Sequence, residues 1–156
     1  MESVVMAIDY LSTPIGDLKI IANDLGLLSV KFVEQTVADI NRNEHTQAGV
    51  TQLTEYFSGT RRQFDLTLTN TGTAFQTAVW RQLMAVPFGT TASYQDIANN
   101  ISNSKAVRAV GAANGKNPIF IIVPCHRVIG ANGLLTGYAG GIDRKLWLLK
   151  HEGAMQ

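Results

Sequence analysis

The sequence predicts an α+β or α/β protein with two lobes, in which a small sheet with one helix precedes a mostly helical lobe that contains a helix-turn-helix. Three observations support this prediction. Alternating apolar and polar residues, typical of strands, fill much of the first third of the chain. Good N-cap residues followed by several apolar helical stripes begin at residue 73. A polar stretch at residues 69–73 separates the two patterns, so we expect one domain over residues 1–70 and a second over residues 71–156.

The first domain is expected to contain a small antiparallel meander and one helix. Residues 4–10 and 18–32 alternate as half-buried strands do, and a turn signal interrupts the second of these ranges. Residues 47–57 place apolar side chains on one helical face, and residues 63–68 have the composition of a last strand. No pattern in this domain is typical of a chemical site.

The second domain is expected to begin with three helices. They span residues 75–85, 94–99 and 105–113, and each is preceded by a residue that can cap its free N–H groups: Thr73, Ser93 and Ser104. The second and third helices, joined by a short polar turn, form a helix-turn-helix pattern. Many folds that do not bind DNA also contain such a pair.

The third of these helices has a bare surface around Arg108. The neighbouring residues are small, namely Ala106, Ala109, Gly111 and Ala112. Such a surface can approach the wall of a nucleic-acid groove closely. It is equally suited to tight packing against another helix, and small residues alone do not distinguish the two.

The only cysteine of the chain, Cys125, follows an apolar run at residues 119–123. The run predicts a buried strand that ends at Pro124. One cysteine excludes an internal disulfide and a zinc site made of cysteines. It leaves packing, covalent chemistry or a contact with another chain as the purpose of Cys125.

A reactive Cys125 would need help from its neighbours. A free thiol has a pKa of about 8.5, so a nucleophilic cysteine requires a base or a positive charge nearby. His126 and Arg127 are adjacent, and a carboxylate to orient the base could come from Asp96, Asp143 or Glu152. A lone cysteine is also compatible with a small buried hydrophobe.

The last part of the chain predicts a loop and a final helix. Glycine is frequent in residues 130–141, which indicates a loop that flexes or lets another group pack on its backbone. The final helix is expected over residues 144–151, capped by Asp143 and ended by Gly153.

Composition and charge limit the class of protein. The chain is 46% hydrophobic and 16% charged, as globular proteins are, and no apolar run approaches the roughly 18 residues of a membrane span. The first residues lack the basic start of a signal peptide, so we expect an intracellular protein.

The net charge of +1 hides an asymmetry. Residues 1–70 hold five Lys and Arg against nine Asp and Glu, a balance of −4, which leaves +5 for residues 71–156. Residues 97–142 contain no acid at all. Such a basic field suits a polyanion partner, and it is also compatible with an ordinary solvated face.

The motif Pro124-Cys125-His126-Arg127-Val128 resembles the signature of the O6-alkylguanine-DNA alkyltransferases, which are methylated-DNA:protein-cysteine methyltransferases. The similarity continues without a gap from about Phe75 to Gly153. It passes through Ser93-Tyr94, Lys105-Ala106-Val107-Arg108-Ala109-Val110-Gly111, Asn117-Pro118, Gly137-Tyr138-Ala139-Gly140-Gly141 and Trp147-Leu148-Leu149-Lys150-His151-Glu152-Gly153. The first 70 residues are similar to the family only in layout, which implies its ribonuclease-H-like lobe.

The resemblance implies a DNA repair reaction centred on Cys125. This residue would take a methyl or larger alkyl group from O6 of guanine irreversibly, as a thioether, so each protein would act once. Glu152 would orient His126, which would deprotonate the thiol through a water molecule. Tyr94 would donate a hydrogen bond to a ring nitrogen of the departing guanine. Activity on O4-methylthymine is left open.

The resemblance also implies a DNA surface and a base pocket. Arg108 would fill the gap left by the flipped nucleotide, from a recognition helix lying in the minor groove. The other residues expected at the DNA are Lys105, Ala106, Ala109, Gly111, Ala112 and Arg127. Asn117 would brace the turn before the cysteine, and the pocket would be formed by Val128, Leu135, Tyr138 and Ala139.

Two departures from the family pattern limit these expectations. Ala139 stands where many relatives have serine, so any hydroxyl contribution is absent there. With one cysteine in the chain, we do not expect the zinc-binding regulatory domain that some bacterial relatives carry. We expect a stand-alone cytoplasmic monomer, present in one or several copies along double-stranded DNA, that needs no cofactor or metal. The alternatives are a non-catalytic lesion binder, a kind of protein that lacks the cysteine, and a cysteine hydrolase, which would turn over repeatedly.

Overall fold

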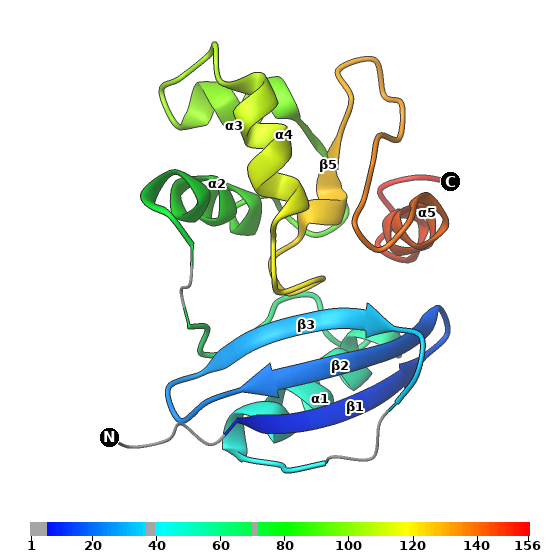
Figure 1. The fold of residues 1–156 in the computed structure, drawn as a ribbon. Helices are drawn as coiled ribbons and strands as arrows, with labels where there is room; N and C mark the ends of the chain where they lie inside the picture. The colour runs from blue at the N-terminus through cyan, green and yellow to red at the C-terminus, as the bar shows by residue number, and fades with distance from the viewer. Residues whose placement is uncertain (1–5, 37–39, 70–71) are drawn as a thin grey trace. The chain divides into compact units, whose positions relative to one another are not determined.

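The computed structural model describes residues 6–36, 40–69 and 72–156. The chain divides into two compact units, Met1–Thr71 and Gly72–Gln156 (Figure 1). Within the described ranges, no helix has the length and apolar character that a membrane crossing requires.

The first unit is a three-stranded antiparallel meander with one helix against it (Figure 1). Strands β1 (Ala7–Thr13), β2 (Gly16–Ala22) and β3 (Leu27–Val33) pair in chain order. Helix α1 (Glu44–Phe57) contacts all three strands. The core side chains alternate along β2, as half-buried strands require, and are joined by two from α1: Leu18, Ile20, Ala22, Leu53 and Tyr56.

The predicted meander and helix are confirmed, and the predicted last strand is wrong. Residues 4 and 5 of the first predicted strand lie outside the described residues. At residues 63–68 only Leu68 forms a bridge, to Leu27. The Gln52 side chain takes the place of a partner strand for this segment. Its amide donates to the Asp65 carbonyl at 3.0 Å and accepts from the Asp65 N–H at 2.9 Å.

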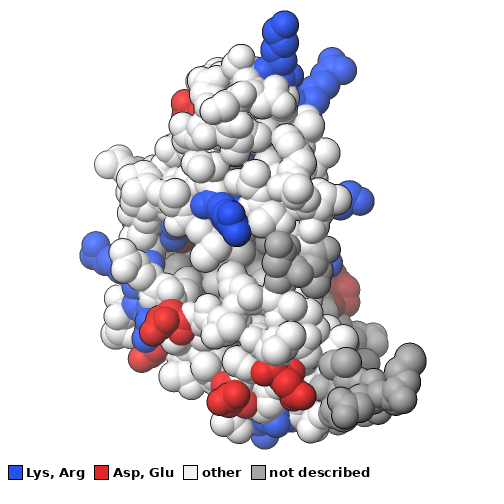
Figure 2. Space-filling model, turned by 90° about the vertical axis from the view of Figure 1, so that its left-hand side faces the viewer, with Lys and Arg blue, Asp and Glu red and all other residues white. Residues whose placement is uncertain are grey.

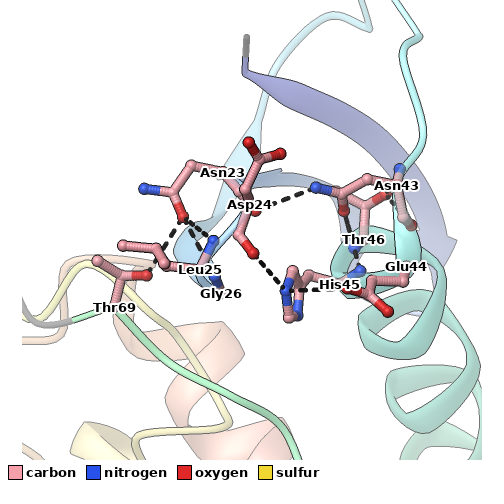
Figure 3. A network of polar contacts seen from close by, with 9 residues as sticks. All are labelled: Asn23, Asp24, Leu25, Gly26, Asn43, Glu44, His45, Thr46 and Thr69. Atoms are coloured by element: carbon pink, nitrogen blue, oxygen red, sulfur yellow. Dashed lines mark hydrogen bonds and ion pairs between the residues drawn. The ribbon is translucent and has the colours of Figure 1, made fainter. Parts of the chain in front are cut away.

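Side chains fasten the turn between β2 and β3 to the start of α1 (Figure 3). Asn43 is the N-cap of α1 and accepts hydrogen bonds from the N–H groups of His45 and Thr46, both at 2.9 Å. Its amide nitrogen donates to the carbonyl of Asn23 at 3.0 Å, and Nε2 of His45 lies 3.1 Å from the carbonyl of Asp24. Polar contacts therefore hold the β2–β3 turn against the N-terminal end of α1.

The second unit is mostly helical. Helices α2 (Ala74–Met84), α3 (Tyr94–Asn100) and α4 (Val107–Gly115) contact one another, and α5 (Ile142–His151) contacts the short 3-10 turn η1 (Cys125–Arg127). The helix-turn-helix pair is α3 and α4 (Figure 1).

Two of the predicted N-caps are confirmed. The side chains of Thr73 and Ser93 each accept a hydrogen bond from the backbone N–H three residues later. The side chain of that later residue in turn accepts a hydrogen bond from the backbone N–H of the cap residue. The expected cap Ser104 is wrong, because the turn continues until the N–H of Ala106 donates to Asn103 and α4 begins only at Val107.

The start of α5 also differs from the prediction. Gly141, not Asp143, is its N-cap, with a φ of 97° that glycine adopts without strain. Asp143 lies in the first turn, where its negative charge favours the helix dipole. The predicted end is confirmed, since Gly153 follows the helix with a φ of 78°.

The predicted buried strand at residues 119–123 is wrong, because the segment is a series of tight turns. The N–H of Ile122 donates to Phe120 at 2.8 Å, and that of Val123 donates to Ile119 at 3.1 Å. Ile121 has a φ of 72°, a costly conformation for a β-branched residue. All five side chains of the run are nevertheless buried, as the apolar pattern predicted.

A two-stranded parallel sheet, absent from the sequence prediction, joins the helix-turn-helix to the cysteine segment. Strand β4 (Ala92–Ser93) precedes α3, and β5 (Val128–Ile129) follows η1. Ala92 pairs with Val128 and Ser93 with Ile129. This pairing places the start of α3, with Tyr94, beside the end of the cysteine segment.

Two glycines of the first unit allow a matched test of its packing. A Cβ on Gly26 would lie 2.6 Å from the carbonyl oxygen of Thr67, whereas a Cβ on Gly49 would make ordinary contacts at 3.5 Å or more. We expect Gly26→Ala to lower the free energy of unfolding by about 1–3 kcal/mol. Gly49→Ala should leave it unchanged or raise it by up to about 1 kcal/mol, because alanine favours helix interiors. Urea denaturation followed by circular dichroism measures both, and equal effects would contradict the close approach at Gly26.

Candidate active site

Three consecutive side chains of η1 form the centre of the candidate site. Cys125 is 2% exposed, His126 is fully buried and Arg127 is 6% exposed. A buried histidine and arginine beside a buried thiol require partners, because unpaired polar groups in an interior are unfavourable. Those partners come from the end of α5 and from the turn after α2.

Glu152, the C-cap of α5, is the partner of both polar side chains of η1. Its Oε2 lies 2.8 Å from Nε2 of His126. Its Oε1 accepts from Nε of Arg127 at 2.8 Å, and Oε2 also accepts from Nη2 at 3.1 Å. The carboxylate is fully buried. It therefore joins the end of the chain to the cysteine segment.

Arg127 extends this cluster to the turn after α2. Its Nη1 donates to the carbonyl of Val86 at 2.7 Å, and its guanidinium lies 5.7 Å from the centre of the Phe88 ring. The assignment of Arg127 to the DNA surface is wrong, because these contacts hold the guanidinium in the interior, where it neutralises Glu152.

The contact with Glu152 fixes the tautomer of His126. Burial by itself would raise the pKa of Glu152, but the hydrogen bonds and charges of His126 and Arg127 lower it to about 2. An ionised carboxylate only accepts hydrogen bonds, so Nε2 of His126 carries the hydrogen. The lone pair is then on Nδ1, which has no hydrogen-bond partner among the described residues.

Burial favours neutral forms of both His126 and Cys125. It lowers the pKa of His126, although Glu152 acts in the opposite direction. It raises the pKa of the Cys125 thiol to about 11, against smaller opposing effects of Asn117 and Lys145. The thiol is therefore protonated at neutral pH, and it can act as a nucleophile only when a base removes its proton.

Asn117 braces the turns that precede Cys125. Its Nδ2 donates to the carbonyls of Val123 at 2.8 Å and Ile119 at 3.2 Å, and its Oδ1 accepts from the N–H of Ile119 at 3.0 Å. One buried amide thus satisfies three backbone groups of a segment that has no strand partner.

Lys145, which the sequence analysis missed, is fully buried close to the thiol. Its ammonium donates to the carbonyls of Val128 at 2.6 Å and Thr136 at 3.2 Å. Burial lowers its pKa to about 8, and a negative charge on Cys125 would raise it again. A signal was present, because Lys145 shares one face of α5 with the buried Leu148 and Leu149.

Tyr94 lies at the start of α3, opposite the glycine-rich loop. Its hydroxyl is 2.7 Å from the hydroxyl of Thr136. Gly111 of α4 is close to the Tyr94 ring, because a Cβ there would be 3.9 Å from two ring carbons. Tyr94 is therefore held between α4 and the loop that contains Thr136.

The residues expected to form a base pocket differ in burial. Val128 is fully buried, and Tyr138 is 9% exposed, with its ring 5.5 Å from that of Phe120. Leu135 is half-buried and Ala139 is exposed. The loop thus presents Tyr138 inward and leaves the backbone around Ala139 accessible.

The residues expected at the DNA, apart from Arg127, lie on α4 or just before it. Arg108, Ala109 and Ala112 are exposed along one side of the helix. Lys105 is exposed, and Ala106 and Gly111 are half-buried. On the face of the second unit drawn in the upper half of Figure 2, the charged side chains that project are mostly basic.

The described part of the chain holds no group of three or more His, Cys, Asp or Glu side chains that could bind a metal ion. What the site does contain is a protonated buried thiol, a neutral histidine with a free Nδ1 and an ionised carboxylate. Such a relay can deliver a thiolate to an electrophile.

Comparisons with known proteins give a consistent result. Residues 74–154 match the family model described as the DNA binding domain of 6-O-methylguanine DNA methyltransferase. Residues 6–69 match the model of the ribonuclease-like domain of the same protein. Together the two models cover most of the chain.

Individual relatives agree with the family models. The chain is 47% identical over 148 residues to a methylated-DNA:protein-cysteine methyltransferase of Methanosarcina acetivorans, covering 91% of this chain and 95% of the relative. A Mycobacterium tuberculosis protein of the same name is 46% identical over 147 residues, covering 91% and 89%.

Solved structures support the same family. The crystal structure of Mycobacterium tuberculosis O6-methylguanine methyltransferase matches with a TM-score of 0.86 at 43% identity, covering 96% of this chain and 94% of that one. A structure of Mycobacterium tuberculosis OGT in complex with DNA matches with a TM-score of 0.87 at 45% identity, covering 95% and 93%.

The buried position of Arg127 leads to a prediction that separates it from Arg108. Arg127→Ala leaves the Glu152 carboxylate buried without its cation, and we expect a loss of about 3–5 kcal/mol in the free energy of unfolding. Arg108→Ala, at an exposed position, should change it by no more than about 0.5 kcal/mol. Urea denaturation measures both. A stable Arg127→Ala variant with weakened DNA binding would instead place Arg127 at the DNA.

Proposed function

The chain belongs to the 6-O-methylguanine DNA methyltransferase family, and we propose that Cys125 is the residue that accepts the alkyl group. Its activity is that of a methylated-DNA:protein-cysteine methyltransferase, which repairs DNA by transferring the alkyl group of O6-alkylguanine to the protein. The observation that carries the assignment of Cys125 is the buried relay beside it, in which Glu152 accepts from Nε2 of His126 at 2.8 Å.

In the proposed reaction His126 acts as the base. Nδ1 of His126 takes the thiol proton through a bridging water, because side chains that are adjacent in a tight turn point apart. Glu152 stabilises the imidazolium that forms. The thiolate sulfur then bonds to the alkyl carbon as the bond from that carbon to O6 breaks.

Guanine leaves as an anion with the electrons of the broken bond. Its ring takes up a proton from solvent, and the His126 imidazolium returns the thiol proton to solvent, so that both groups end neutral. The hydroxyl of Tyr94 donates a hydrogen bond to a ring nitrogen and so stabilises the charge that develops there. The thioether on Cys125 has no route back to a thiol within this relay. Each chain therefore reacts once and is consumed.

We assign DNA binding to the exposed side of α4. Small residues let this side approach the DNA backbone closely, and Arg108 occupies the space of the nucleotide that is flipped out. Arg108, Ala109 and Ala112 are exposed there, which supports the assignment. The protein acts on double-stranded DNA, and we propose that it does so as a cytoplasmic monomer, alone or in several copies along the DNA.

A stoichiometric transfer assay tests the role of Cys125. Incubation with a duplex that contains one O6-methylguanine should add a single methyl mass to the peptide with Cys125, and the reaction should stop at one event per protein. Cys125→Ala should abolish transfer and still bind DNA, because the thiol takes no part in binding. Repeated turnover would instead indicate a hydrolase, and binding without transfer by the unmodified protein would indicate a lesion binder.

The role of Arg108 predicts a difference between substrates. Arg108→Ala should slow transfer from O6-methylguanine in a duplex by about 10-fold or more, because unstacking a base costs a few kcal/mol. Transfer from free O6-benzylguanine, which needs no flipping, should change little. Rates of Cys125 modification with both substrates provide the measurement, and Lys116→Ala is a control that removes an exposed positive charge outside α4. An equal loss with both substrates would contradict a flipping role.

A further inference from the structure

The relay of Glu152, His126 and Cys125 leaves one buried charged side chain without a role. Lys145 of α5 is fully buried, and its ammonium donates to the carbonyls of Val128 at 2.6 Å and Thr136 at 3.2 Å. Neither carbonyl carries a charge, and no carboxylate among the described residues forms an ion pair with the ammonium. A buried cation without a counter-ion is strongly unfavourable, so packing alone does not explain its presence.

The other ionisable groups around Lys145 and the thiol do not supply the missing anion. Oε1 of Glu152 is already paired with Nε of Arg127 at 2.8 Å. Burial lowers the pKa of His126 and raises the pKa of Tyr138, so both side chains are neutral. The remaining charged or titratable side chains of α3 and α5 are Tyr94, Asp96, Asp143, Arg144, Lys150 and His151.

The thiol of Cys125 is the group that can become an anion near Lys145. The charge of Lys145 lowers the pKa of Cys125, and a thiolate raises the pKa of Lys145, so the two charges stabilise each other. In the resting protein the effect of burial is larger, and the thiol remains protonated. A thiolate formed during the reaction therefore gives Lys145 the counter-ion that it lacks.

Backbone contacts fix the ammonium relative to the cysteine segment. The N–H of Val128 donates to the carbonyl of Cys125, and the carbonyl of Val128 accepts from Lys145. Val128 also pairs with Ala92 in the two-stranded sheet. One residue of firmly held backbone thus separates the contact of the ammonium from the carbonyl of Cys125.

Lys145 also joins the two ends of the glycine-rich loop. Val128 precedes this loop, and Thr136 lies at its far end. Thr136 makes no hydrogen bond between backbone groups in the part of the chain that the structure describes. Its polar partners are Lys145, which donates to its carbonyl, and Tyr94, whose hydroxyl lies 2.7 Å from its side-chain oxygen. Loss of the ammonium would therefore release one of the two contacts that hold Thr136.

We propose that Lys145 is a positioning residue of the transfer reaction, whose ammonium holds the ends of the glycine-rich loop together and supplies the counter-charge for the Cys125 thiolate. The inference rests on the proposed function of Cys125. Lys145 acts through its charge and through the backbone of Val128 and Thr136. Because both carbonyls already fix the ammonium, it needs no rearrangement when the thiolate forms.

Loss of the proton from Lys145 removes this counter-charge, so the reactivity of Cys125 should depend on pH in two ranges. Below the Lys145 pKa of about 8 the ammonium is charged, and the amount of thiolate rises with pH as it does for any thiol below its own pKa. Above about pH 8 the lysine loses its proton, which makes the thiolate harder to form. The two effects oppose each other, and the rate should level off.

The test follows alkylation of Cys125 by iodoacetamide at increasing pH, without DNA, from the mass of the peptide that contains this residue. No other cysteine is present to react. The rate for the unmodified protein should level off above about pH 8. Lys145→Met, which is similar in length and neutral, should react roughly 10-fold more slowly at neutral pH and should not level off. Methyl transfer from a duplex with O6-methylguanine should slow by a similar factor.

A matched variant and the pH profile make the outcomes distinct. Lys150→Met makes the same change at an exposed position of α5 and should alter neither rate. If Lys145→Met slows transfer from DNA but leaves alkylation by iodoacetamide unchanged, or still levels off, Lys145 only supports the fold and the inference is overturned. A rate for the unmodified protein that rises through pH 8 without levelling off also overturns it, and this result does not require that the variant folds.

The two proposals fail in different ways. If the unmodified protein transfers no methyl group from O6-methylguanine, the function assigned to Cys125 is contradicted. Alkylation by iodoacetamide requires neither DNA nor a modified base, so it still shows whether Lys145 supplies a counter-charge to the thiolate.

Discussion

The active segment of this protein depends on one buried carboxylate. An ionised Glu152 without a cation would be strongly unfavourable in the interior, so Arg127 must remain beside it. Arg127 in turn contacts the carbonyl of Val86, and Glu152 fixes the tautomer of His126. The end of α5, the turn after α2 and η1 are therefore held together by a single set of charges. The same contacts leave Nδ1 of His126 as the acceptor for the Cys125 proton in the proposed reaction.

Burial has opposite effects on the pKa values of Cys125 and His126, the two groups that exchange a proton in the proposed reaction. It raises the pKa of Cys125 to about 11 and lowers that of His126, so the resting site holds a protonated thiol and a neutral base. Such a thiol reacts poorly with chance electrophiles, because only the thiolate is strongly nucleophilic. Lys145 becomes more strongly cationic when a thiolate forms, since a charge on Cys125 raises its pKa from about 8. In the proposed reaction, the positive charge of Lys145 would therefore stabilise the thiolate once it has formed.

Local patterns predicted the elements whose ends are set by neighbouring residues. Thr73 and Ser93 cap their helices because a hydroxyl needs only the next turn to find its partners. The prediction of a strand at residues 119–123 was wrong because Asn117, through its side chain, satisfies the backbone groups that a strand would have paired. The assignment of Arg127 to DNA was wrong for a related reason: its partner, Glu152, is 25 residues away in the chain. Composition and residue spacing do not indicate contacts between residues that are so far apart in the sequence.

The second unit contains buried polar groups that are paired within the protein and others that are not. Glu152 and Arg127 have partners in the protein, and they hold the site together. Asn114, His126 and Tyr138 each keep one buried atom that no described residue satisfies, and all three lie around Cys125. Helix α4 connects this cluster to the side that we assign to DNA binding, because Asn114 contacts Cys125 while Arg108 is exposed to solvent on the same helix.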